Sequence, residues 1–231
     1  MSTRRWMLSL PWLWIVAAPA HAALRVEIVS QTRQITWAAH AEDAQGSIDK
    51  RIARSGSNTA TWTPASDTMR ESLVIPPRPT DEQEVIVPAI TGATIAWYRS
   101  SNTTRSLTAA SFCEVNLTVE DPATGSGVTR CENRYQVQFH LSGLSFVQLS
   151  GTLTSNGVAG GIISLRTTAG EILAETSSGN ETLGYAANLP PGDYVFQVDL
   201  TAVATIPLEQ PPADSVFRAG TGSVNATLNF H

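Results

Sequence analysis

Lysine is nearly missing from this chain, since Lys50 is the only one among 231 residues. The positive charges are therefore almost all arginines, and 15 basic residues stand against 20 acidic ones, for a formal net charge of -5. No run of basic residues is longer than a pair. Nucleic acids and anionic membranes are bound through larger basic patches, so the sequence predicts no nucleic acid as a partner and no anionic membrane surface.

Long apolar runs are also missing, apart from residues 6–18 near the N-terminus. That run is interrupted by Ser9 and Pro11 and is shorter than the ~20 residues that a transmembrane helix needs. The pair Arg4-Arg5 precedes it, and Ala20-His21-Ala22 follows it with the small-x-small pattern of a signal peptidase site. This three-part order is typical of a secretory signal.

We therefore expect residues 1–22 to be a cleaved signal peptide, which leaves 209 of the 231 residues as the mature chain. Without Arg4 and Arg5, 13 basic residues then face 20 acidic ones. A retained N-terminal anchor is one alternative, and twin-arginine export is an alternative to the general route that we favour. We expect no integral membrane segment in the mature chain, and a periplasmic or secreted location in a bacterium.

Cysteine is scarce, with only Cys113 and Cys131 present. Two sulfurs with no nearby histidine make a poor zinc site, whereas an even pair in an oxidising compartment predicts a disulfide. Both cysteines lie at apolar positions of alternating runs, and a hairpin centred on Pro122 brings them to the same side of one sheet. We expect a cross-strand disulfide beneath the turn at residues 121–125.

A helical period is missing, and strict alternation of apolar and polar residues takes its place. The alternating runs are residues 24–28, 113–119, 135–141, 194–202 and 224–230. Alternation indicates strands with one buried and one solvated face, and turn residues separate the runs. The sequence predicts an all-β fold, an antiparallel β-sandwich that is jelly-roll-like, as a single domain over residues 23–231. We expect its first and last strands to be neighbours near a sheet edge.

Three segments depart from this alternation. Residues 67–74 are where we expect a short helical turn. Residues 75–84 are rich in proline, and residues 206–222 contain Pro211-Pro212 and Gly220. Because proline has no N–H to donate to a ladder, we predict both of these segments to be loops.

Motifs of nucleophilic catalysis are missing too. The chain has no Gly-x-Ser-x-Gly elbow, and the histidines after the signal, His40, His140 and His231, follow no known motif. No Cys/His zinc spacing and no phosphate-binding glycine loop occurs, so we expect no cofactor. Calcium stays open as an alternative, because residues 42–49 hold the densest acidic group, although without EF-hand spacing.

Two functions, polysaccharide hydrolysis and sugar binding, need only residue types that this chain has. Hydrolysis of a polysaccharide needs two facing carboxylates. The acidic candidates at predicted solvent-facing or turn positions are Glu114, Glu120, Glu132, Asp193 and Asp199. Sugar binding uses exposed aromatic rings. Trp37 and Trp97 share faces with isoleucines and fit a core, so Trp62 and Tyr98 are the predicted sugar-binding residues.

Residues 135–231 resemble a recurring type of uncharacterised exported bacterial β-sandwich protein. The resemblance rests on the strand at residues 135–141, the motif L-S-G-T-L at residues 149–153, the turn L-P-P-G-D-Y at residues 189–194 and a closing strand. It implies the fold and export, and it implies no known activity.

These observations favour a non-catalytic periplasmic or secreted protein that binds a glycan or another cell-envelope component. The alternative is a secreted hydrolase that acts on a polysaccharide through paired carboxylates.

Overall fold

The computed structural model describes residues 26–43, 46–56, 65–75, 78–79, 86–87, 90–119, 125–177, 179–207 and 216–231. The predicted signal peptide lies outside these residues, so its cleavage stays a prediction. Within the described part there is no helix, and hence none that could span a membrane. The segment at residues 67–74, predicted as a helical turn, is instead part of the strand β3 (Ala65–Ile75).

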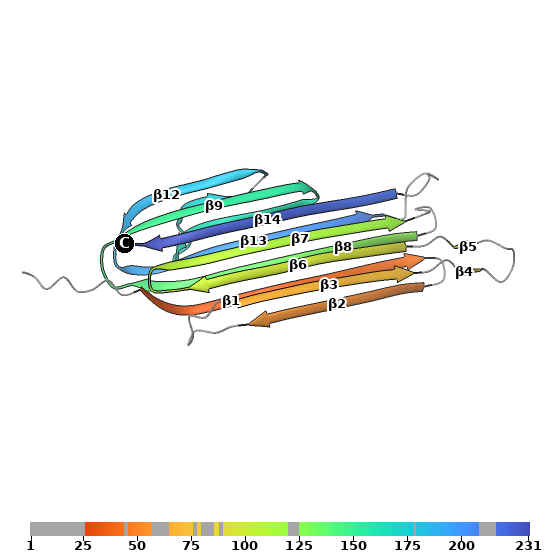
Figure 1. The fold of residues 1–231 in the computed structure, drawn as a ribbon, viewed down its shortest axis with the longest axis horizontal. Coiled ribbons are helices and arrows are strands. Elements are labelled where there is room, and N and C mark those ends of the chain that lie inside the picture. Colours follow the sequence, from red (N-terminus) through yellow and green to blue (C-terminus); the bar gives the residue numbers. More distant parts are fainter. Residues whose placement is uncertain are drawn as a thin grey trace, which may run out of the picture.

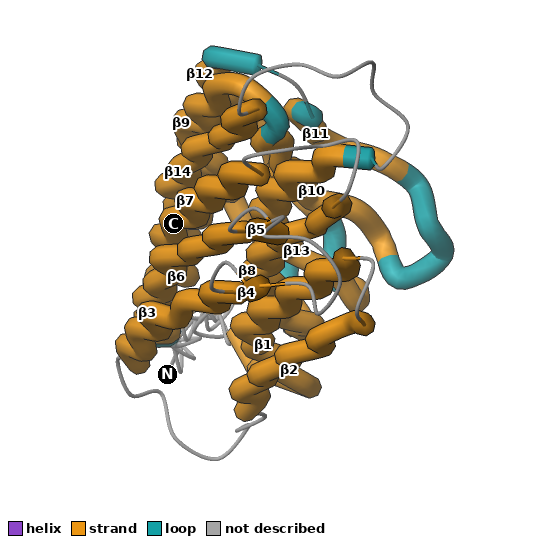
Figure 2. Tube along the Cα trace, turned by 90° about the vertical axis from the view of Figure 1, so that its right-hand side faces the viewer, coloured by secondary structure: helices purple, strands orange, loops and turns teal. Residues whose placement is uncertain are grey.

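Two six-stranded antiparallel sheets make up the fold (Figures 1 and 2). The first sheet has the order β11 (Ile172–Thr176), β10 (Ala159–Thr167), β13 (Gly192–Ile206), β8 (Gly125–Leu141), β1 (Val26–Asp43) and β2 (Gly46–Gly56). The second has the order β12 (Glu181–Leu189), β9 (Ser145–Gly157), β14 (Val216–Phe230), β7 (Ser106–Val119), β6 (Ile90–Asn102) and β3. A separate pair joins β4 (Arg78–Pro79) to β5 (Ile86–Val87).

The chain crosses repeatedly from one sheet to the other. In Figure 2 the two sheets form two layers, and successive strands such as β7 and β8, or β13 and β14, lie on opposite layers. The last two strands insert between earlier ones, because β13 lies between β10 and β8, and β14 lies between β9 and β7. This confirms the predicted antiparallel β-sandwich, with strand pairs wrapped as in a jelly roll.

One expectation about the strand order is wrong. The first strand, β1, pairs with β2 and β8 in the first sheet, whereas the last strand, β14, pairs with β7 and β9 in the second. The two strands are therefore not neighbours. Alternation alone assigns each residue a face, and it carries no information about which strands pair.

The core fills the space between the sheets, and it follows from the alternation of each strand. In β7 every second residue is buried from Leu107 to Val119. The largest side chains that are fully buried include Trp37, Tyr135, Phe139 and Phe196. Burial of each large apolar side chain stabilises the fold by about 1.5–3 kcal/mol, so this interior is the main source of stability.

The disulfide between Cys113 and Cys131 is present, with 5.9 Å between the two Cα atoms. Its predicted place in a single-sheet hairpin is wrong. Cys113 in β7 pairs with residues of β6 and β14, and Cys131 in β8 pairs with residues of β1 and β13. The chain changes sheets between β7 and β8, so the bond crosses the core and joins the two sheets. Both arrangements need the cysteines to face inward, which is why alternation did not distinguish them.

The loop predicted at residues 206–222 is shorter than expected. Strand β13 continues to Ile206, and β14 begins at Val216, so that Gly220 and Gly222 are strand residues. A Cβ atom at Gly222 would lie 2.9 Å from the Leu200 side chain, so glycine serves close packing here. Within residues 75–84, the described residues are Ile75, which ends β3, and the short strand β4.

Candidate functional site

The outer face of the first sheet carries three polar residues in one row across adjacent strands. Gln34 in β1 pairs with Arg134 in β8, and Arg134 pairs with Asp199 in β13. Residues that lie opposite each other share a face of a sheet. The neighbours of these residues along the strands, such as Val198 and Leu200, are buried in the core, so the row faces outward.

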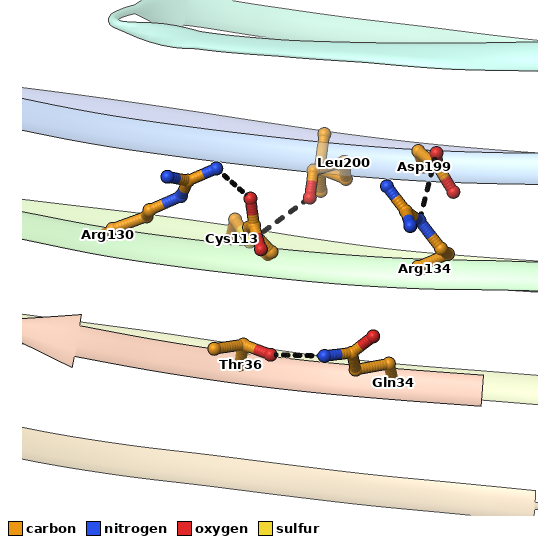
Figure 3. Close-up of polar contacts among 8 residues, drawn as sticks. Gln34, Thr36, Cys113, Arg130, Arg134, Asp199 and Leu200 are labelled. Carbon is orange, nitrogen blue, oxygen red and sulfur yellow. Dashed lines mark hydrogen bonds and ion pairs between the residues drawn. The ribbon is translucent and has the colours of Figure 1, made fainter. Parts of the chain in front are cut away.

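A second row lies beside the first. Thr36 in β1 pairs with Glu132 in β8, and Glu132 pairs with Thr201 in β13. Figure 3 shows this part of the sheet, with Gln34 directed along its strand toward Thr36 and Arg134 directed across toward Asp199. The Gln34 amide donates to the Thr36 hydroxyl over 2.9 Å. The two rows together place carboxylate, guanidinium, amide and hydroxyl groups on three neighbouring strands.

A pocket of about 170 Å³ opens between these rows. It is lined by Gln34, Glu132, Asn133, Arg134, Asp199 and Thr201. The side chain of Asn133 turns inward, where its Nδ2 donates to the carbonyl of Phe112 on β7 over 2.8 Å. Sites for drug-sized ligands measure roughly 300–1,000 Å³, so this pocket is small and has room for one unit of a larger polar ligand.

Asp199 is the most unusual side chain of the pocket. Its Oδ2 accepts a hydrogen bond from Gln197 Nε2 over 2.6 Å and lies 3.4 Å from Arg134 Nε. Its Oδ1 is buried and has no hydrogen-bond partner among the described residues. The side chain is only 16% exposed, whereas that of Arg134 is 58% exposed. One acceptor of this carboxyl group is therefore left unmatched.

Burial raises the pKa of the Asp199 carboxyl above its ordinary value. The hydrogen bond from Gln197 and the positive charge of Arg134 act in the opposite direction, toward a lower pKa. Burial prevails because the guanidinium of Arg134 is more than half exposed, and water screens its charge. The site thus holds a carboxyl group that binds a proton more readily than a solvated aspartate does.

Glu132 supplies the second carboxyl group of the pocket. It forms an ion pair with Arg130, two residues away on the same strand. Glu132 is opposite Thr201, which is two residues beyond Asp199, so the two acidic residues are diagonal neighbours. Diagonal neighbours in an antiparallel pair are about 7–8 Å apart, which lets one small ligand reach both carboxyl groups.

The predicted sugar-binding aromatics do not form this pocket. Trp62 lies outside the described residues. Tyr98 belongs to β6 in the second sheet, where its backbone pairs with Asp67 and Ser111, and its side chain lies outside the described part. The prediction that Trp37 belongs to the core is confirmed, since this residue is fully buried.

The sequence indicated Glu132 and Asp199 among the acidic candidates at solvent-facing or turn positions, and it did not indicate Gln34, Arg134 or Thr201 as site residues. Alternation places all five on an outward face. Only the pairing of β1, β8 and β13 brings them together, and these strands are far apart in the sequence.

The other polar candidates form no comparable site. Where residues are described, no group of three or more His, Cys, Asp or Glu residues is placed to hold a metal ion. The acidic residues Glu42, Asp43 and Asp49 belong to the paired strands β1 and β2, and their side chains lie outside the described part. The His140 side chain is partly exposed, and its Nδ1 lies 2.8 Å from Asp193 Oδ1.

Comparisons with known proteins assign no family. No family model and no curated protein matches the chain. Among solved structures, it is similar to the VP2 subviral particle of infectious bursal disease virus, with a TM-score of 0.20, 9% identity, and coverage of 88% of this chain and 57% of that one. It is also similar to bacteriophage CBA120 tailspike protein 4, with a TM-score of 0.11, 12% identity, and coverage of 74% of this chain and 19% of that one. The chain thus spans little more than half of the viral protein, and TM-scores this low say nothing about function.

Proposed function

We propose that this protein is an exported, non-catalytic binding protein whose outer-face pocket takes a neutral sugar unit of a glycan. The observation that carries the proposal is Asp199, a little-exposed residue that lines a pocket of polar side chains and whose buried Oδ1 lacks a hydrogen-bond partner among the described residues. A buried acceptor without a partner costs about 1–3 kcal/mol, and a ligand hydroxyl would recover this cost once the Asp199 side chain turns its Oδ1 toward the pocket.

The other groups of the pocket fit a polyhydroxylated ligand. Each sugar hydroxyl both donates and accepts a hydrogen bond. Gln34 and Thr201 offer donors and acceptors, Arg134 offers donors, and Glu132 offers acceptors. Asp199 and Glu132 would repel an anionic sugar, so we expect neutral sugars to bind better than uronic acids.

The proposed location outside the cytoplasm rests on the signal peptide expected at residues 1–22 and on the Cys113–Cys131 disulfide. Disulfides persist in oxidising compartments such as the periplasm and the extracellular medium. The pair is compatible with either compartment.

A glycan array followed by calorimetry tests the proposal. We expect one class of neutral glycan to bind, and Asp199→Asn to weaken its affinity at least tenfold, because the change removes the charge that strengthens hydrogen bonds from the ligand. Asp193→Asn is the matched control, since Asp193 lies on the same strand and is half exposed at its far end. If no glycan on the array binds, or if both variants lose the same affinity, the proposal is contradicted.

A second candidate is the polysaccharide hydrolase, which is favoured because Glu132 is a diagonal neighbour of Asp199, a carboxyl group of raised pKa. A general acid needs such a raised pKa, and the second carboxylate then acts as base or nucleophile. Incubation with the glycans that bind separates the two functions. Release of sugar that stops in both Glu132→Gln and Asp199→Asn supports hydrolysis, whereas binding without product supports the binding protein.

A further inference from the structure

The four strands at the sheet edges differ in how well they are protected from pairing with another chain. The edge strands are β2 and β11 in the first sheet and β3 and β12 in the second. Natural proteins protect edges with charged residues or by keeping the strand short. β2 carries four charged residues in 11, β3 carries three in 11, and β11 is only five residues long.

β12 has little of this protection, because its one charged residue is Glu181 at the first position. It is nine residues long, and all nine pair with β9 on one side, from Glu181 opposite Leu153 to Leu189 opposite Ser145. No described strand pairs with its other side. From Thr182 to Leu189 it has no charged residue and no proline. Figure 1 shows β12 at the edge of its sheet, so within the described part of the chain a row of its backbone N–H and C=O groups is available to a further strand.

The core is also incompletely covered beside this edge. Leu183, Tyr185 and Ala187 in β12 face inward and pack against the core, yet they are only partly buried. The facing strand β11 is four residues shorter than β12, and its first residue, Ile172, is 59% exposed. An open strand edge therefore lies next to apolar side chains that a partner could cover.

We propose that β12 pairs antiparallel with β12 of a second copy of this chain, to form a symmetric dimer with its two-fold axis beside Tyr185. In this register Leu183 lies opposite Ala187 of the other copy, and Thr182 lies opposite Asn188. Inward residues then meet inward residues, because opposite positions share a face. The two second sheets join into one, and the apolar residues at the edge become covered.

A second copy fits this edge because the strand is uncharged from Thr182 to Leu189. Self-pairing brings no like charges opposite each other between Thr182 and Leu189. The one acidic residue of the strand, Glu181, comes to lie opposite Leu189 at either end of the paired region. A symmetric contact of this kind is closed, so it stops at two copies.

Sedimentation velocity over a range of concentrations tests the dimer. We expect the purified chain to dimerise as its concentration rises, and Ala187→Lys to raise the dimer dissociation constant at least tenfold, because an inward lysine at an edge blocks pairing. Thr152→Lys is the matched control, since Thr152 is exposed on β9, the neighbouring strand of the same sheet. A chain that stays monomeric, or equal weakening by both lysines, overturns the proposal.

A cross-link gives a second test that does not depend on the stability of Ala187→Lys. Tyr185→Cys places one thiol on each side of the two-fold axis, so mild oxidation should give a covalent dimer. Thr152→Cys should stay monomeric under the same conditions. The native cysteines are fully buried in their own disulfide and cannot exchange. Equal cross-linking of the two variants would overturn the proposed register.

Discussion

At the scale of single residues, Asp199 is the side chain whose surroundings most clearly change its chemical properties. Its strand and its alternation place it outward, yet Gln197, Arg134 and the pocket wall leave little of it exposed. The result is an acceptor that lacks a partner and a carboxyl group whose pKa is raised by burial. Such a group is unfavourable for folding alone, which is why we regard it as functional.

The raised pKa of Asp199 predicts how stability changes with pH. Between the ordinary pKa of an aspartate and the raised one, the folded state binds more protons than the unfolded state, so stability must fall as pH rises through that window. In Asp199→Asn this component of the fall disappears. Melting temperatures of the wild type and the variant at a series of pH values from about 3 upward measure the difference.

Asp193→Asn provides the comparison for that experiment. Asp193 is half exposed and lies at the other end of the same strand. If it changed the pH dependence as Asp199→Asn does, the effect would not belong to the buried carboxyl.

At the scale of elements, β10 shows how closely a strand face can pack. Gly160 and Gly161 are adjacent and point to opposite faces. A Cβ atom at Gly160 meets nothing within 4 Å, whereas one at Gly161 would lie 2.7 Å from the backbone carbonyl oxygen of Asp199 and 2.8 Å from the Leu153 side chain. The inner face of β10 therefore requires glycine at position 161.

We expect Gly161→Ala to lower the free energy of unfolding by about 1–3 kcal/mol, because the clash involves backbone that cannot simply turn away. Gly160→Ala should leave it within about 0.5 kcal/mol of the wild type, since a Cβ atom at this partly buried position meets nothing within 4 Å. Urea unfolding curves give both values. Equal effects of the two substitutions would contradict the packing seen here.

At the scale of the whole molecule, the Cys113–Cys131 bond joins the two sheets through the core. Each sheet is held by its own ladder, whereas contacts between the sheets are otherwise made by side chains. The bond also closes a loop over a sequence separation of 18. Loops of that length are associated with about 3 kcal/mol of stabilisation from the restricted unfolded chain.

The variant with Cys113→Ala and Cys131→Ala should therefore unfold with a free energy lower by about 3 kcal/mol or more, because it also loses buried sulfur atoms. Urea unfolding measures the loss. Reduced wild-type protein keeps the sulfur atoms and lacks the bond, so its unfolding curve separates the two contributions. An unchanged urea midpoint in both samples would exclude a role of the bond in stability.

Much of the fold could be predicted because alternation is a local property. The burial of Trp37 and the inward cysteines follow from period-two patterns alone. The extent of β14 could not be predicted, because Gly220 and Gly222 indicate a turn locally and instead serve close packing against other strands. The candidate site could not be predicted either, since Gln34, Glu132 and Asp199 come from strands whose pairing the sequence does not indicate.

The sequence by itself determined that this protein consists of strands, which side of most strands is buried, and that its two cysteines face inward. Each of these follows from side chains that alternate between the two faces of a strand, whatever the partner strand is. The tertiary structure alone decided which strands are neighbours, that the disulfide joins two sheets, and that a polar pocket opens on β1, β8 and β13. Those features depend on contacts between distant parts of the chain, and a local periodic pattern does not specify which distant parts come into contact.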